Sequence, residues 1–454
     1  MNTSEAPEAI LESWLEQHLG RVIRIERQGR WRPAWYAEVQ RPQGAWSLYV
    51  RGARADELVQ PQPLSFECAV FQLFERSGVR VPHVHGFIHE LPAIVMDRVP
   101  GAPGVQRVAS GPVREQLLSQ FVDQMVLIHH GVDAREMQRA GAPRPDGAAA
   151  LALAYLHRIE PLYERQKQRP EPAIEFLRGW LKRNVPPTPD VAYPILVDAG
   201  QFIFEGDRLT AMLDFELAAL GAFHADLAVL RLRDRMEPIG DLERLYELYE
   251  VRAGLQIDRK RLRYHTVIEG LLPALHMAGV LGAPEGAADY VQYLSWYAAW
   301  MKVAFESIFE IKGWTLGEFQ TPAPQPTSRY DVALPLLAND LRADASDDEL
   351  AQYQRRRRLR LAKFMDRTRA YQGFLERQYL DDVKELLGHC PTGWAQADAQ
   401  LERFILQTDG TRDEALARLL LRQLLGQCFL LADPEEPADF APLTTPLEPL
   451  RERM

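Results

Sequence analysis

Strand-like runs of apolar residues are concentrated in the first 98 of the 454 residues of this chain. Five such runs, separated by glycine and proline breakers, flank one amphipathic helical stretch around Phe66 to Phe74. Val99-Pro100-Gly101 follows the last run, and a strand cannot continue through it because proline lacks the donor of a ladder hydrogen bond. We therefore expect residues 1–98 to form a small lobe of strands with one inserted helix. The five runs are 22–27, 35–40, 46–51, 83–88 and 93–98.

Beyond Gly101 the apolar spacing becomes helical, apart from short apolar runs between 195 and 215. Three prolines within Gly317 to Tyr330 indicate a linker, because proline has no backbone donor and resists helix. The capping sequence Ser346 to Glu349 then predicts the start of an amphipathic helix. The expected division is a first lobe, 1–98; a mainly helical second lobe, 99–317; a linker, 318–330; a helical domain, 331–431; and an extended proline-rich tail, 432–454.

The charge and cysteine content exclude several classes of protein. Lys and Arg number 53 against 63 Asp and Glu, and the net charge of -10 argues against a nucleic-acid binder or a binder of anionic membranes. The longest nearly apolar stretch, around Leu271 to Leu281, is too short to span a bilayer. The 3 cysteines form no C-x-x-C pair, so neither a disulfide framework nor a zinc site is expected. These features suit a cytoplasmic protein.

The strongest chemical signal is a pair of acids, Asp214 and Glu216, directly after the apolar run that begins at Leu209. Carboxylates at the end of a strand are suited to hold Mg²⁺, which takes one or two of them together with phosphate oxygens. The alternative is a hairpin that ends in two solvated acids, because two acids alone make a weak motif.

The surrounding sequence resembles the aminoglycoside phosphotransferase and choline-kinase-like family, whose fold is related to that of protein kinases. That family carries an Asp-Trp-Glu motif followed by Gly-Asp-Pro-x-x-Asp-Leu-Ala, and this chain has Asp214-Phe215-Glu216 followed by Gly221 to Ala228. Further segments resemble the family over roughly residues 10–315, and several weak motifs in the right order are more specific than one. They are Trp180 to Pro187, Phe66-Glu67 with Gly78 to Pro82, Ile94 to Gly101, and Leu127 to His129.

The resemblance implies an α+β, two-lobed protein-kinase-like fold, with a small strand-rich N-lobe and a mainly helical C-lobe, followed here by an all-helical C-terminal domain. It also implies Mg²⁺ with ATP or GTP, bound between the lobes. In the N-lobe, Arg51 would grip the nucleotide phosphates and pair with Glu67. The alternative for Arg51 is a surface residue at the end of a strand. The phosphate-covering loop would be Gln28 to Arg32.

The catalytic loop departs from the family pattern. Where the family reads His-Gly-Asp-x-x-x-x-Asn, this chain reads Leu196-Val197-Asp198-Ala199-Gly200-Gln201. A loop two residues shorter places Asp198 on the catalytic Asp and Gln201 on the Asn, whereas counting back from Asp214 without a gap places Leu196 on the Asp. We prefer the first alignment, because the strand Ile195 to Val197 then ends where the family's strand ends.

By resemblance, Asp198 would orient the acceptor, Asp214 and Glu216 would hold Mg²⁺, and Gln201 would assist at the nucleotide. The expected function is transfer of a phosphoryl group from ATP or GTP to a hydroxyl of a small molecule. The alternative is a weakly active or inactive binding or scaffolding protein of the same fold, because the catalytic loop is altered. The acceptor is open between an aminoglycoside and a hydroxylated acyl metabolite. The helical domain could serve a protein partner or self-association.

Overall fold

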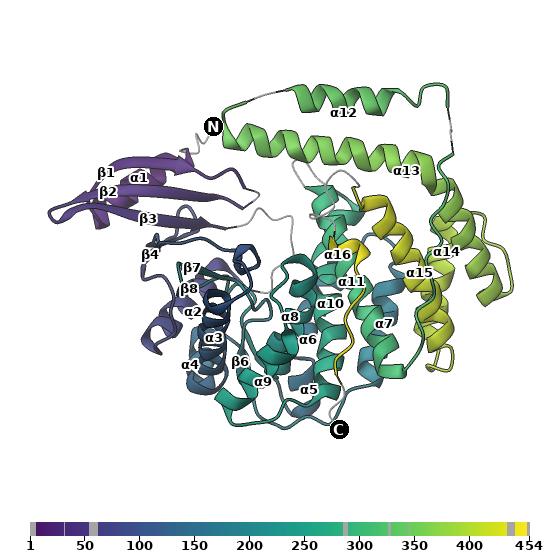
Figure 1. Cartoon of the computed structure of the whole chain (residues 1–454), viewed down its shortest axis with the longest axis horizontal. Coiled ribbons are helices and arrows are strands. Elements are labelled where there is room, and N and C mark those ends of the chain that lie inside the picture. Colours follow the sequence, from purple (N-terminus) through teal and green to yellow (C-terminus); the bar gives the residue numbers. More distant parts are fainter. Residues whose placement is uncertain are drawn as a thin grey trace.

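The N-lobe is a five-stranded antiparallel sheet with one helix before it and one helix between its third and fourth strands. The computed structural model describes residues 6–30, 32–53, 62–284, 289–325, 328–344, 346–433 and 441–451. The strands are arranged in the order β1-β2-β3-β5-β4. All five predicted strands and the inserted helix are present (Figure 1). The elements are α1 Pro7–His18, β1 Arg21–Arg27, β2 Ala34–Arg41, β3 Gly44–Gly52, α2 Leu64–Arg76, β4 Val84–Ile88 and β5 Ala93–Asp97.

The two faces of this sheet pack against different partners, because side chains alternate along a strand. Trp35, Val39 and Leu48 share a core with Leu11 and Leu15 of α1. Residues of α2 pack instead with the C-lobe, in a core that also contains Phe215 and Leu227. Helix α2 therefore belongs to the N-lobe in sequence but is held between the lobes.

The C-lobe is mainly helical, with two short antiparallel strand pairs at its centre. Strand β6 pairs with β9, and β7 pairs with β8. The loop from β6 to β7 carries residues 196–201, and the segment from β8 to β9 carries Asp214 to Glu216. The strands are β6 Tyr193–Ile195, β7 Phe202–Glu205, β8 Arg208–Met212 and β9 Ala219–Gly221, and the main helices are α3 Pro112–Val126, α4 Ala134–Ala140, α6 Ala154–Gln166, α7 Pro172–Arg183, α8 His224–Met236, α9 Leu242–Ala253, α10 Arg259–Gly282 and α11 Tyr290–Lys312.

The C-terminal region is helical and packs on the C-lobe. Leu401 of α14 and Leu420 of α15 lie in the same apolar core as Trp180 and Phe305 of the C-lobe. The described residues 314–325 between the lobe and this region form neither helix nor strand, and residues 326 and 327 of the predicted linker lie outside the described ranges. The domain division at 318–330 stays a prediction. The helices are α12 Ala333–Ala343, α13 Glu349–Leu387, α14 Trp394–Gln407, α15 Asp413–Leu431 and α16 Ala441–Thr444.

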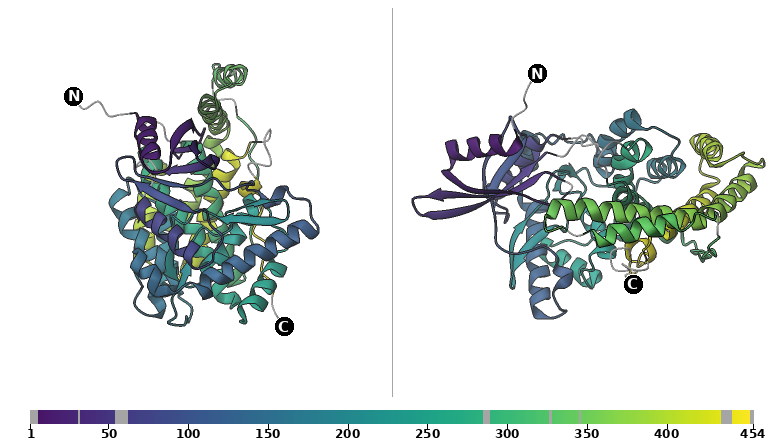
Figure 2. Two further views of the ribbon diagram at one scale, coloured as in Figure 1. Left: turned by 90° about the vertical axis from the view of Figure 1, so that its left-hand side faces the viewer. Right: turned by 90° about the horizontal axis from the view of Figure 1, so that it is seen from above.

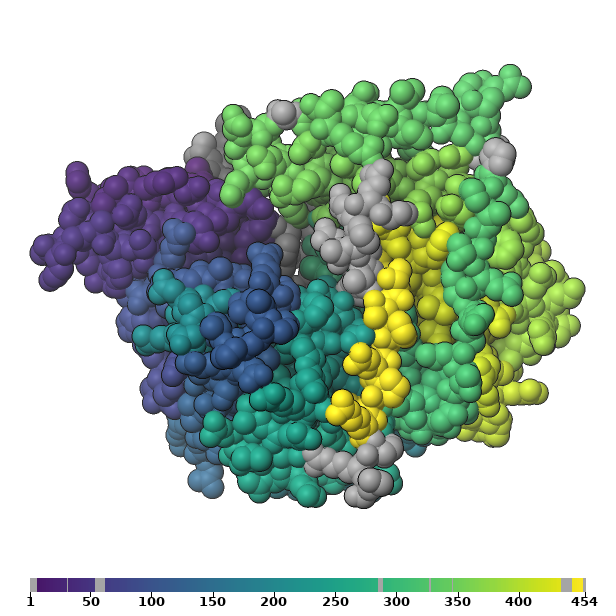
Figure 3. Space-filling model, in the orientation of Figure 1, coloured from purple at the N-terminus to yellow at the C-terminus, as the bar shows by residue number. Residues whose placement is uncertain are grey.

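Helices α12 and α13 form a hairpin that lies over the C-lobe, with one end beside the N-lobe (Figures 2 and 3). The long helix α13 begins beside the loop between β1 and β2, where the Gly29 backbone N–H donates to Glu349 Oε2 at 3.4 Å. A Cβ on Gly29 would lie 2.8 Å from the Glu349 backbone, so this approach requires glycine. The capping prediction needs a correction: the N-cap is Asp348, whose side chain accepts from the Ala351 N–H at 2.7 Å, and not Ser346.

The last described segment, 441–451, returns along the C-lobe, and residues 434–440 and 452–454 of the predicted tail lie outside the described ranges. Charged side chains of α11 bind its backbone. Lys302 donates to the Thr445 carbonyl at 2.6 Å, and Glu306 and Glu310 accept from the N–H groups of Leu447 and Leu450 at 2.9 and 2.8 Å. Within the described ranges, no helix is both long enough and apolar enough to cross a membrane.

Candidate functional site

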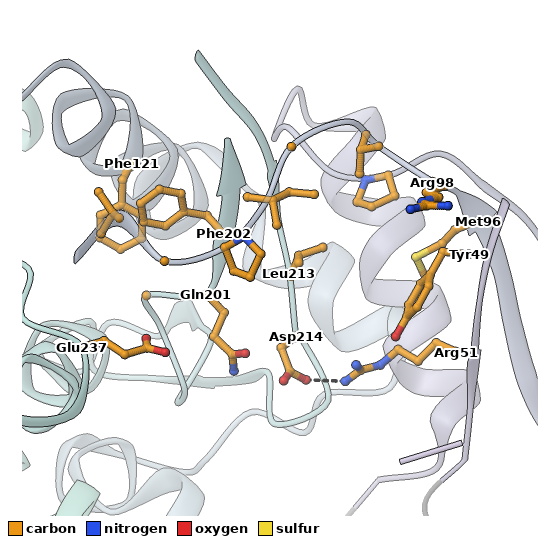
Figure 4. Close-up of a pocket in the computed structure, with 18 of the residues that line it drawn as sticks. Tyr49, Arg51, Met96, Arg98, Phe121, Gln201, Phe202, Leu213, Asp214 and Glu237 are labelled. Carbon is orange, nitrogen blue, oxygen red and sulfur yellow. Dashed lines mark hydrogen bonds and ion pairs between the residues drawn. The ribbon is translucent and has the colours of Figure 1, made fainter. Parts of the chain in front are cut away.

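A cavity of about 390 Å³ opens between the two lobes (Figure 4). Tyr49, Arg51 and Met96 line it from the N-lobe sheet, and Gln201 and Asp214 line it from the C-lobe hairpin. In the close-up, Asp214 lies between the side chain of Gln201 on one side and that of Arg51 on the other. Residues that the sequence separates by more than 150 positions therefore meet at one cavity.

Arg51 stands at the N-lobe side of this cavity, near the end of β3. Its Nε donates to Glu67 Oε2 at 3.0 Å. Its Nη2 contacts Asp214 Oδ1 and lies 3.6 Å from Glu216 Oε2. Burial by itself would lower the pKa of Arg51, but the three carboxylates raise it well above the ordinary value. Burial raises the pKa of Glu67, and Arg51 opposes that shift. The structure thus brings the predicted pair together and adds both acids of the Asp214 motif.

A second arginine, Arg32, enters the same cluster from the loop between β1 and β2. Its guanidinium contacts Glu216 and lies 4.0 Å from Glu67 Oε2, and the side chain is almost fully buried. Glu216 is consequently paired beneath the cavity instead of forming part of its lining. Sequence reasoning placed Arg32 in the phosphate-covering loop but missed this ion pair. Trp31 of that loop lies outside the described residues.

The backbone at Asp214 is fixed by its neighbours. Asp214 has φ 65°, a left-handed conformation that is uncommon for a residue other than glycine. The next residue, Phe215, is fully buried, and its ring contacts Phe71 and Phe74 of α2 at centroid distances of 4.7 and 4.9 Å. Its N–H also donates to Glu67 Oε1 at 3.2 Å. Helix α2 therefore holds both the partner of Arg51 and the turn that presents Asp214.

Asp198 lies on the C-lobe side, in the loop after β6. Gln201 Nε2 donates to its Oδ2 at 2.7 Å, and Arg233 of α8 donates to its Oδ1 from Nε at 2.9 Å and from Nη2 at 2.6 Å. Burial raises the pKa of Asp198 above the ordinary aspartate value, Arg233 opposes the shift, and Asp214 reinforces it. Arg233 was not identified from the sequence, because nothing in its spacing distinguishes it from its neighbours Arg231 and Arg235.

Buried groups hold the backbone of this loop from below. Asp226 Oδ2 and Oδ1 accept from the N–H groups of Leu196 and Val197, each at 2.7 Å, and His129 Nε2 lies 2.9 Å from Asp226 Oδ2. Val197 has φ 67°; among the described residues it and Asp214 are the two non-glycine residues in this region of φ. Sequence reasoning included Asp226 in a motif without assigning it a task, although an acid at the start of an apolar helix was a usable signal.

The acidic groups at the cavity suit a hard cation bound together with phosphate. Among the described residues there is no group of three or more His, Cys, Asp or Glu side chains that could hold a metal by themselves. Mg²⁺ does not require such a group, since it is commonly bound by one or two carboxylates plus substrate phosphates and water. Asp214, with 21% of its side chain exposed at the cavity, and Gln201 beside it supply oxygen donors that fit this type of binding.

Comparisons with solved structures list several phosphotransferases. A Ralstonia eutropha protein provisionally described as an aminoglycoside phosphotransferase has 18% identity and a TM-score of 0.49, over 65% of this chain and 95% of that one. A macrolide 2'-phosphotransferase of Brachybacterium faecium has 17% identity and a TM-score of 0.43, over 61% and 99%. A spectinomycin phosphotransferase bound to ADP and spectinomycin has 10% identity and a TM-score of 0.43, over 66% and 97%. TM-scores below 0.5 do not by themselves establish a shared function.

No curated protein matches the chain. The model of the phosphotransferase enzyme family (APH), however, matches residues 35–265, which is half of the chain and includes β2 to β5, the catalytic-loop region and the Asp214 motif. The match confirms the resemblance that the motifs indicated. The chain therefore belongs to the phosphotransferase enzyme family, with its two-lobed kinase-like fold and an added helical region at the C-terminal side.

Proposed function

We propose that this protein transfers the γ-phosphoryl group of ATP or GTP to a hydroxyl group of a small molecule. The observation that carries the proposal is that Arg51, Asp214 and Gln201 line one interlobe cavity and that Gln201 donates to Asp198 behind it, in a chain of the phosphotransferase family. Transfer of this kind needs little covalent work from the protein, and depends on positioning and on neutralising charge.

In the proposed mechanism, Arg51 exchanges its contacts with Asp214 and Glu216 for contacts with nucleotide phosphates. Its hydrogen bond to Glu67 is kept and holds the guanidinium in position. Asp198 accepts a hydrogen bond from the acceptor hydroxyl and takes its proton as the oxygen attacks phosphorus. The bond from phosphorus to the bridging oxygen breaks, and the nucleoside diphosphate leaves. Tyr49 and Met96 provide the apolar wall of the cavity against which a base can lie.

Asp214 is the carboxylate that we propose for Mg²⁺, with Gln201 as a neutral oxygen donor beside it. When bound, the ion neutralises charge on the β- and γ-phosphate oxygens. Glu216 was expected to share this role. Its pairing with Arg32 favours a supporting role, in which it keeps the loop between β1 and β2 close to the cavity.

The backbone supports the shorter catalytic loop. With Asp198 on the family's catalytic Asp, Val197 takes the place of the glycine in His-Gly-Asp, and it has the left-handed φ that glycine adopts most easily. With the ungapped alignment, that Asp would be replaced by Leu196, which is 1% exposed and cannot act on a substrate. We therefore retain Asp198 as the base.

The acceptor can be found by a transfer assay. Purified protein is incubated with Mg²⁺, γ-labelled ATP or GTP and a panel of hydroxylated compounds that includes aminoglycosides and hydroxyacyl compounds. We expect a labelled product with at least one acceptor, and none with Asp198→Asn. Nucleotide binding without transfer to any acceptor, and without hydrolysis above a buffer blank, would favour the scaffolding alternative. The cytoplasm remains the expected location, since Cys68, Cys390 and Cys428 are all free thiols.

A further inference from the structure

The shortened catalytic loop is built around the side chain of Arg233. Both donors that this guanidinium uses on Asp198 lie on one oxygen, Oδ1, at 2.9 and 2.6 Å. The remaining nitrogen, Nη1, is 3.4 Å from Glu237 Oε2, and 48% of the Glu237 side chain is exposed. That contact is long and close to solvent, so it is the weakest that Arg233 makes and the easiest to exchange for another anion.

Gly200 is fitted to the same side chain. Its φ of +105° is a conformation that other residues rarely adopt, and a Cβ at this position would lie 2.9 Å from Arg233 Cδ and 3.3 Å from Leu230 Cδ2. The loop therefore passes over Arg233 closely enough that only glycine leaves room for it. The short loop, Gly200 and Arg233 are therefore fitted to one another. A side chain on the surface would not require a glycine in the loop above it.

Arg233 also faces the cavity from the side opposite to Arg51. Four arginines line the cavity in the described part of the chain, and Arg30, Arg51 and Arg98 all come from the N-lobe. Arg98 stacks over the Tyr36 ring at 3.8 Å, and Arg30 donates to the Tyr49 hydroxyl at 3.2 Å. Arg233 alone of the four touches Asp198, the carboxylate at which we place the acceptor hydroxyl.

We propose that Arg233 is a further catalytic residue, which binds an oxygen of the transferring phosphoryl group through Nη1 while Nε and Nη2 hold Asp198. This inference rests on the proposed function. As the acceptor oxygen bonds to phosphorus and the bond to the leaving diphosphate breaks, negative charge is spread over the three non-bridging oxygens. A guanidinium at this position neutralises that charge from the C-lobe side.

The test uses binding, so it does not depend on knowing the acceptor. Affinity for MgADP is measured with and without aluminium fluoride, which mimics the phosphoryl group during transfer. In the wild type we expect fluoride to tighten ADP binding by at least about tenfold, because a group that stabilises the transition state binds its mimic more tightly. Arg233→Met should lose this tightening and keep its affinity for MgADP alone within about threefold. Arg233→Lys keeps the charge but lacks the several fixed N–H donors of a guanidinium, so its fluoride effect should be intermediate.

Two further variants separate this role from a structural one. Gly200→Ala keeps the guanidinium but displaces it, and it should weaken the fluoride effect while MgADP still binds; it also serves if Arg233→Met fails to fold. Arg235→Met is the matched control on the same helix, since Arg235 pairs with Asp234 at 2.7 Å and donates to the Pro446 carbonyl at 3.0 Å, outside the cavity lining. The control should retain the full fluoride effect.

Two results would overturn the inference: an undiminished fluoride effect in both Arg233→Met and Gly200→Ala, or the absence of any fluoride effect in a wild type that binds MgADP. In either case the proposed function survives, because the nucleotide site is intact. A wild type that binds no MgADP at all would instead remove the proposed function, and this inference with it.

Discussion

The two sides of the cavity differ in how closely they follow the family pattern. On the N-lobe side, Arg51 and Glu67 form a buried pair that contacts Asp214 across the cavity, and the motifs had already identified all three residues. On the C-lobe side, Asp198 is held by Arg233 and Gln201 in a loop two residues shorter than the family's. The side that would bind the nucleotide thus stays close to the family pattern, whereas the side that would carry out transfer has a different loop length and different residues. The loop after β6 therefore keeps a carboxylate bonded to two residues of the cavity lining, Gln201 and Arg233, although its sequence differs from the family's.

The largest expected effect concerns the C-lobe side. Asp198→Asn should reduce turnover by about 10²–10⁴-fold, since a general base and orienting group acts on the transition state. Nucleotide affinity should change little, because Asp198 is bonded to Gln201 and Arg233 on the C-lobe side, whereas Arg51 is the proposed phosphate ligand. Steady-state kinetics, with the acceptor found by screening or with slow nucleotide hydrolysis, measures the turnover number and the nucleotide KM. An Asp198→Asn variant as active as the wild type would show that this loop does not supply the base.

The next effect concerns the side that follows the pattern. Asp214→Asn should weaken nucleotide binding in the presence of Mg²⁺ by about 10–100-fold, because charge-assisted contacts contribute roughly 1.5–3 kcal/mol. Binding without Mg²⁺ should change far less. Isothermal titration of ATP with Mg²⁺ or with EDTA measures the difference. Equal losses under both conditions would indicate that Asp214 acts by holding Arg51 in position, with no part in metal binding.

A smaller effect concerns stability at acidic pH. His224 begins α8, the helix that supplies both Asp226 and Arg233, and burial lowers its pKa to about 3, with help from Arg261 and His129. The unfolded chain binds this proton near pH 6.5 and the folded chain does not, so the stability present above pH 6.5 is lost as the pH falls toward 3. The slope is about 1.4 kcal/mol per pH unit for one such group.

Thermal melts of wild type and His224→Asn between pH 7 and 5 measure that slope. The variant should have the shallower pH dependence, whatever its stability at pH 7. Parallel curves would assign the acid sensitivity to another group, with His265 the first candidate, because burial also lowers its pKa.

The smallest effect concerns the contact between the C-terminal helices and the loop between β1 and β2. Glu349→Ala removes the 3.4 Å contact to the Gly29 N–H, which is exposed, so we expect a change of less than about 1 kcal/mol and a few-fold rise in nucleotide KM. Asp347→Ala, two residues earlier, is the matched control. Identical KM values for the two variants would mean that α13 touches the loop without influencing it.

Much of the fold and part of the site could be predicted from the sequence. Alternating apolar runs and breakers identified all five N-lobe strands, and the motif around Asp214 identified the segment at the cavity. Arg32 and Arg233 were missed because each is one arginine among several, and only the path of the backbone decides which one turns inward. The sharing of one core by Trp180 and Leu420 was missed for a similar reason, since an amphipathic pattern shows which face of a helix is buried but not the partner that buries it.

The most direct test of the account is equilibrium binding of ATP and GTP to the wild-type protein, each with and without Mg²⁺, followed by thermal shift. The account predicts that at least one nucleotide stabilises the protein, by about 2.7 kcal/mol when it is present at a hundred times its Kd. Mg²⁺ should increase this stabilisation. Melting temperatures that stay unchanged with both nucleotides at millimolar concentration, with or without Mg²⁺, would contradict it, because the cavity between Arg51 and Asp214 would then have no nucleotide to bind.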